Sequence, residues 1–174
     1  MNRLWIAGIV LTVALGAPAC SDKDEDPSDT NPNVARFQAA LLQSNEVPAI
    51  DNADRTGSGI ASITMNLTRD GSNNITAATI EFVVTLQNFP ANTSLSAAHI
   101  HTGAAGVGGG VLVGVTMSSG EIVLSSTGSG GFTKPGNITA EQAQNIINNP
   151  AGFYFNVHTP LSPGGAVRGQ LVAQ

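Results

Sequence analysis

Two stretches of this chain alternate apolar and polar side chains, one residue at a time. The apolar members are Ala61, Ile63, Met65 and Leu67 in the first stretch and Ile80, Phe82, Val84 and Leu86 in the second. Because successive side chains of a β-strand point to opposite faces, this spacing predicts strands with one face buried and the other in water. Half-buried strands of this kind are typical of antiparallel sheets.

Further short runs of the same kind predict a series of seven or eight strands. They lie at 37–42, 60–67, 79–86, 96–101, 111–115, 122–126, 153–158 and 166–172. One short helix near 140–148 interrupts the series, because Thr139 and Gln142 form a capping box and Ile146 and Ile147 supply an apolar side. We therefore expect an all-β fold, an antiparallel Greek-key β-sandwich or flattened barrel of 7–8 strands with one helix.

The first 33 residues have a different character from the rest. Arg3 precedes an apolar stretch at 4–15, and Gly16-Ala17-Pro18-Ala19 then leads to Cys20, the only cysteine. Twelve apolar residues are too few to span a bilayer, so residues 1–19 predict a signal peptide. Residues 20–33 are rich in Asp, Ser, Asn and Pro and predict a disordered acidic tether to a domain at 34–174.

The small residues before Cys20 resemble a bacterial lipoprotein box. That resemblance implies that Cys20 is lipidated through its sulfur and anchors the protein to the membrane, in the cell envelope, facing the periplasm or the cell exterior. The alternative is ordinary signal cleavage near Ala19, which leaves Cys20 as a free thiol. In either case a lone cysteine cannot form a disulfide within the chain.

Charge excludes one class of partner. The formal net charge is −5 at pH 7, and nucleic acids require a basic surface, so we expect no nucleic-acid partner.

All three histidines of the chain fall at predicted strand ends. His99 and His101 are two residues apart and therefore point to the same side of one strand, and His158 ends another. If the third ring joins the first two, they form a site for copper, or less readily zinc, because imidazole suits both metals and structural zinc prefers four ligands. In the alternative, the rings bond neighbouring backbone. Tyr154 and Asn156 share the face of His158 and are expected to support it.

The remaining residues offer little other chemistry. The glycine-rich segment 103–110 lacks the Lys and Ser/Thr of a phosphate-binding loop and predicts a flexible turn with positive φ angles. Neither a Ser-His-Asp set nor a pair of carboxylates for glycoside hydrolysis is evident. Arg168 is expected either to pair with a carboxylate such as Glu46 or Glu81 or to attract an anion. No catalytic residue is predicted.

Four motifs, in this order, resemble the CHRD domain, named for the secreted animal protein chordin and found in many exported bacterial proteins. They are Asn45-Glu46-Val47-Pro48, His99-Ile100-His101-Thr102-Gly103, Tyr154-Phe155-Asn156-Val157-His158-Thr159 and the segment at 163–171. The resemblance covers residues 34–174. It implies no particular reaction, and Ala166 stands where an acidic residue is common in the family.

A second, more distant resemblance is to copper–zinc superoxide dismutase. It rests on the His-x-His strand, the later Val-His and the closing Arg-Gly strand. It implies that His99, His101 and His158 bind copper and that Arg168 guides an anion. The chain departs from that family in lacking a fourth histidine, a zinc ligand set and a disulfide.

These observations predict an exported, membrane-tethered protein that acts as a binding or structural module. The alternative is a copper or zinc binding protein that uses the three histidines, and an enzyme of the dismutase type comes third. The ligand and any protein partner are not predicted.

Overall fold

A computed structural model describes residues 31–174, and the structural statements below concern this part of the chain. Cys20, the predicted signal peptide and most of the predicted tether lie outside the described residues. The described residues form nine strands, one α-helix and three short 3-10 turns. They are β1 (Val34–Leu42), η1 (Gln43–Asn45), η2 (Ala53–Thr56), β2 (Ser58–Arg69), β3 (Ile75–Gln87), β4 (Ala97–Thr102), β5 (Val111–Gly114), β6 (Gly130–Gly136), α1 (Ala140–Asn148), η3 (Pro150–Gly152), β7 (Phe153–His158), β8 (Val167–Gln170) and β9 (Val172–Ala173).

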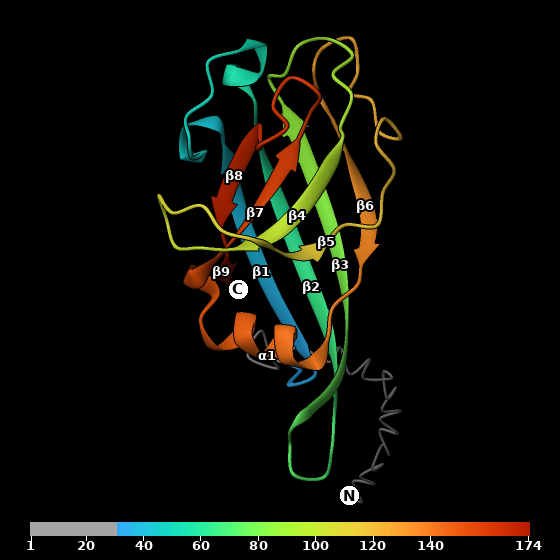
Figure 1. The fold of residues 1–174 in the computed structure, drawn as a ribbon. Helices are drawn as coiled ribbons and strands as arrows, with labels where there is room; N and C mark the ends of the chain where they lie inside the picture. The colour runs from blue at the N-terminus through green and yellow to red at the C-terminus, as the bar shows by residue number, and fades with distance from the viewer. Residues whose placement is uncertain (1–30) are drawn as a thin grey trace, which may run out of the picture. The chain divides into compact units, whose positions relative to one another are not determined.

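The strands form one antiparallel sheet in the order β5-β4-β7-β8-β1-β2-β3-β6, and β9 pairs with β1. The group β4–β7–β8 crosses the group β1–β2–β3, as Figure 1 shows. An isolated bridge between Val115 and Gly136 joins the two ends of the sheet and nearly closes a barrel. The predicted all-β antiparallel fold is confirmed in its flattened-barrel form. The two-residue β9 brings the count above the expected 7–8.

The alternating stretches behave as their spacing predicts. Ile63 pairs with Phe82 across β2 and β3, and both side chains are buried. All eight apolar residues of the two stretches are buried: Ala61, Ile63, Met65, Leu67, Ile80, Phe82, Val84 and Leu86. Their burial removes apolar surface from water and provides the main stabilisation of this half of the barrel.

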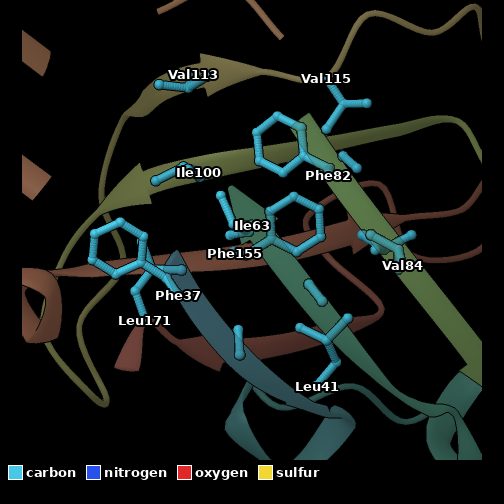
Figure 2. Packing of buried hydrophobic residues seen from close by; sticks show 14 of the residues in the cluster. Phe37, Leu41, Ile63, Phe82, Val84, Ile100, Val113, Val115, Phe155 and Leu171 are labelled. Atoms are coloured by element: carbon cyan, nitrogen blue, oxygen red, sulfur yellow. The ribbon is translucent and has the colours of Figure 1, made fainter. Parts of the chain in front are cut away.

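The two halves of the barrel meet in the core through aromatic contact. The ring centroids of Phe82 on β3 and Phe155 on β7 lie 5.3 Å apart at an interplanar angle of 26°. Figure 2 shows these rings beside Ile63 and Ile100. Both phenylalanines are fully buried, so the contact joins the two crossing groups of strands in a single core.

The predicted helix is present with the predicted cap. Thr139 Oγ1 accepts from the Gln142 backbone N–H, and the Gln142 side chain accepts from the Thr139 N–H. Ile146 is buried and Ile147 packs partly against the core. Gln142 Nε2 also donates to the Leu112 carbonyl, which ties α1 to β5. No helix within residues 31–174 is long and apolar enough to cross a bilayer.

One predicted strand is wrong and another was missed. Residues 122–126 form no strand and contribute only the bridge from Val123 to Ser94. The strand beside β3 is instead β6, whose glycines and Pro135 argue against a strand in the sequence. An edge strand tolerates proline. Gly131 is needed because a Cβ there would lie 2.1 Å from the Val84 carbonyl oxygen.

The aromatic contact in the core yields a stability prediction. Phe82→Ala is expected to lower the free energy of unfolding by about 3–5 kcal/mol, because it leaves a cavity beside Phe155. Val83→Ala, at the exposed neighbouring position on β3, is the control and is expected to change it by less than about 1 kcal/mol. Urea unfolding of the two variants and the parent measures both. Equal losses in the two variants would contradict the assigned core.

Candidate metal centre

The structure brings the three histidines together. Strands β4 and β7 are antiparallel neighbours, with His99 opposite Asn156 and Ala97 opposite His158. The ring centroid of His99 lies 5.4 Å from that of His101 and 4.9 Å from that of His158. The third pair, His101 and His158, is 6.0 Å apart. We call these three residues the histidine cluster.

Backbone carbonyls fix the tautomers of two rings. His101 Nδ1 donates to the Gly109 carbonyl and His158 Nδ1 donates to the Pro163 carbonyl, each over 3.0 Å. A neutral imidazole that donates from Nδ1 has its lone pair on Nε2. His158 Nε2 lies 3.1 Å from His99 Nδ1. His101 Nε2 is buried and has no hydrogen-bond partner within residues 31–174. The lone pair of His158 Nε2 therefore accepts from His99 Nδ1 within the cluster, and the lone pair of His101 Nε2 is left without a donor in the described residues.

Burial keeps the three rings neutral. It lowers the pKa of His99 to about 4, with a further contribution from the neighbouring His158 and His101. Burial is also the main cause of the lowered pKa of His101 and of His158. At neutral pH the rings therefore carry lone pairs and not extra protons, which is the state that binds metal ions.

The cluster fits a transition-metal ion. One ligand atom from each ring lies within 4.8 Å of the others. Copper and zinc bind imidazole at about 2.0–2.1 Å, so nitrogens around one tetrahedral ion lie about 3.3 Å apart. The contact between His99 and His158 already meets that spacing. The His101 nitrogen, within 4.8 Å of the other two, has to move toward them to reach it. The unpartnered His101 Nε2 is itself a reason to expect a ligand there.

Tyr154 supports the cluster from one side. Its ring is parallel to that of His101, with centroids 4.9 Å apart and an interplanar angle of 5°. The guanidinium carbon of Arg168 lies 3.4 Å from the Tyr154 ring centroid. Because β7 lies between β4 and β8 in the sheet, Tyr154 separates Arg168 from His101. Arg168 therefore stacks on Tyr154, and its charge makes a small contribution to the lowered pKa of His101.

The expected ion pair of Arg168 is not present. Within residues 31–174 the structure shows one ion pair, Lys134 with Glu121, so neither Glu46 nor Glu81 pairs with Arg168. Its Nη2 instead donates to the carbonyls of Ala104 and Val107 and to the Gln170 side chain. Two backbone carbonyls that the sequence analysis did not identify therefore accept hydrogen bonds from the Arg168 guanidinium.

Asn156 is buried on β7 opposite His99, and its side-chain oxygen has no hydrogen-bond partner within the described residues. It thus lies on the face that the sequence predicted. Its side chain interacts with the His101 ring and acts to raise the pKa of that ring, against the larger effect of burial.

Two supporting features were missed by the sequence analysis. The glycine-rich segment, besides the predicted positive φ at Gly103 and Gly106, bonds the cluster through Gly109, whose N–H donates to the Tyr154 hydroxyl. Asp54, fully buried in η2, accepts from the hydroxyls of Thr159 and Ser162. This holds the loop that carries the Pro163 carbonyl to His158. Backbone acceptors carry no signature in a sequence, so neither role could be read there.

A family model for the CHRD domain matches residues 37–171. This protein therefore belongs to the CHRD family, as its four motifs predicted. A search of curated proteins found no match, and a search of solved structures found none.

The contacts of Gly109 generate a prediction about the cluster. Gly109→Ala is expected to lower the free energy of unfolding by about 2–4 kcal/mol, because the added Cβ would lie 1.7 Å from the Thr102 carbonyl oxygen. The movement that relieves this clash also breaks the bond to His101. Thermal unfolding and the His101 ring resonances in NMR measure the two effects.

Gly108→Ala is the matched control, because a Cβ at Gly108 meets no atom within 4 Å. It is expected to change the free energy of unfolding by less than about 1 kcal/mol. Similar behaviour of the two variants would mean that the segment does not hold His101.

Proposed function

We propose that this CHRD protein is an exported binding module, tethered to the membrane through lipidated Cys20 and acting in the cell envelope. The support lies in the sequence. A basic start, a short apolar stretch and small residues precede the only cysteine, and an acidic, polar segment follows it. Two acyl chains on one cysteine suffice for stable anchoring. A segment such as 20–33, with little apolar surface, suits a tether.

We propose further that the species bound is a metal ion, held by His99, His101 and His158. The observation that supports this most directly is the orientation of His101: its Nδ1 is bonded to a carbonyl and its buried Nε2 has no partner. Leaving a polar atom buried and unpaired costs about 1–3 kcal/mol, and coordination of an ion removes that cost. A carbonyl on the far nitrogen is the usual support of a metal-bound histidine.

Copper is the favoured ion. Three imidazoles complete neither a structural zinc site, which needs four ligands, nor a hard oxygen site for calcium or magnesium. Among divalent first-row ions, Cu²⁺ binds nitrogen ligands most tightly. Bound copper would supply a redox-active centre or a cargo for delivery or storage. Zinc with a water as fourth ligand is the less favoured choice.

A purely structural role for the histidines is the alternative, in which the rings bond one another and the two carbonyls without an ion. A dismutase-type enzyme comes third. The chain has no fourth histidine. Arg168 packs on the Tyr154 ring and not on the histidine cluster. Superoxide turnover by the copper-loaded protein distinguishes this third case from the other two.

Copper titration of the untagged, metal-stripped protein tests the metal proposal. One Cu²⁺ per chain is expected, and His101→Ala is expected to weaken binding by at least about 100-fold because it removes one of three ligands. Isothermal titration gives the stoichiometry and affinity, and electron paramagnetic resonance reports nitrogen ligands.

Tyr154→Phe is the control for that titration. It keeps the ring stacked on His101 and removes only the hydroxyl that accepts from Gly109. Copper binding within about threefold of the parent is expected. Failure of the parent to bind stoichiometric copper, or equal binding by His101→Ala, would leave the structural role as the explanation of the cluster.

The anchor is tested separately in a bacterial host that expresses the full chain. Cys20→Ser is expected to move the protein from the membrane fraction to the soluble fraction, because the acceptor sulfur is lost. Ser28→Ala, in the same segment, is the control and is expected to remain in the membrane fraction. Retention of the Cys20→Ser variant at the membrane would refute lipidation at this residue.

A further inference from the structure

A second feature of the described residues lies on the far side of Tyr154 from the histidine cluster. It is a cavity of about 380 Å³ between the η1 turn, β8 and the glycine-rich segment. Glu46 and Arg168 both line it, together with Gln170 and aliphatic side chains that include Val47 and Val172. Small-molecule sites have volumes from about 300 Å³ upward, so the cavity suits a small ligand.

Arg168 brings donors to this cavity that residues 31–174 do not use. The side chain is 1% exposed, and the hydrogen bonds that it makes within residues 31–174 all come from Nη2. No residue in the range 31–174 accepts a hydrogen bond from Arg168 Nε or Nη1. The Tyr154 ring below and the carbonyls of Ala104 and Val107 hold the guanidinium in place. A fixed guanidinium with free N–H groups is suited to a carboxylate.

Glu46 brings an unused acceptor to the same cavity. It is 6% exposed, and its Oε1 is buried without a hydrogen-bond partner in the described part of the chain. Burial raises the pKa of Glu46 to about 7, although the charge of Arg168 acts in the opposite direction. The backbone of Gly165 packs closely against the carboxylate, since a Cβ there would lie 2.5 Å from both oxygens.

The two charged groups are not paired with each other. A salt bridge would place a guanidinium nitrogen within 4.0 Å of a carboxylate oxygen, and none forms between Arg168 and Glu46. Burying two charges without pairing them is costly. A ligand that carries both an anionic and a cationic group can satisfy both residues at once. Anions or amines alone would satisfy one and leave the other unpaired.

We propose that this cavity binds a free aliphatic α-amino acid, whose carboxylate accepts from Arg168, whose ammonium donates to Glu46, and whose side chain lies against Val47 and Val172. The charge pattern selects a zwitterion, and the aliphatic lining selects an apolar side chain. This site is distinct from the histidine cluster, because the Tyr154 ring lies between Arg168 and His101.

The test compares L-leucine with two analogues that each lack one charge. 4-Methylpentanoate lacks the ammonium group and 3-methylbutylamine lacks the carboxylate. Isothermal titration at pH 8, with the chain free of metal, is expected to show L-leucine binding at least about tenfold more tightly than either analogue. Chemical-shift changes at Val172 and Gln170 in NMR locate the binding.

Glu46→Gln removes the charge and keeps the shape of the side chain. It is expected to abolish the preference for L-leucine over 4-methylpentanoate. Glu81→Gln, at an exposed position on β3, is the matched control and is expected to keep that preference. Circular dichroism checks the fold of both variants, and the comparison of analogues on the unaltered chain decides the proposal if Glu46→Gln does not fold.

Three results would overturn the proposal. The first is no L-leucine binding at about 10 mM, in which case the cavity holds only water. The second is binding of either analogue as tight as that of L-leucine. The third is an unchanged preference in a folded Glu46→Gln variant. Copper binding is expected to be retained in Glu46→Gln, so failure here is distinguishable from failure of the metal proposal.

Discussion

The pairing of β4 with β7 is the contact on which the rest of this domain depends. It joins segments more than fifty residues apart, and its register does two things at once. On one face it sets Ile100 opposite Phe155, and so brings one crossing group of strands into the common core. On the other face it brings His158 beside His99 and His101. A shift of β7 by one residue in this register would exchange its two faces, turning His158 into the apolar core and Phe155 out of it.

Much of the fold follows from local spacing, because burial of one face and helix capping are decided within a few residues. The alternation at 60–67 and 79–86 predicted the two longest strands, β2 and β3, and Thr139 with Gln142 predicted the start of α1. The strand β6 could not be found in this way. Gly131 is there because the Val84 carbonyl approaches too closely for a side chain, and Gly136 because Phe82 and the Gly114 carbonyl do. This close packing arises from the tertiary structure and leaves no local pattern in the sequence.

Part of the candidate site could likewise be predicted from local sequence, and part depends on the tertiary structure. The identity of the histidines and their shared face on β4 could be read from the sequence, and so could the position of Tyr154. The position of His158 beside His99 and His101 could not be predicted locally, because it depends on the pairing of β4 with β7. The supporting carbonyls of Gly109 and Pro163 could not be foreseen, because every residue has a carbonyl and only the fold selects which one faces a ring. Arg168 was expected either at a carboxylate such as Glu46 or Glu81 or at an anion; it pairs with neither carboxylate and lies on the ring of Tyr154.

Tyr154 is in contact with the two regions proposed to bind ligands. One face of its ring lies against His101 and the other against the guanidinium of Arg168. Any displacement of the tyrosine by an occupant on one side alters the surroundings of the other. Thermodynamic linkage then demands reciprocity: whatever factor a copper ion imposes on amino-acid affinity, the amino acid imposes on copper affinity. A single aromatic side chain could in this way make the domain report on two solutes together.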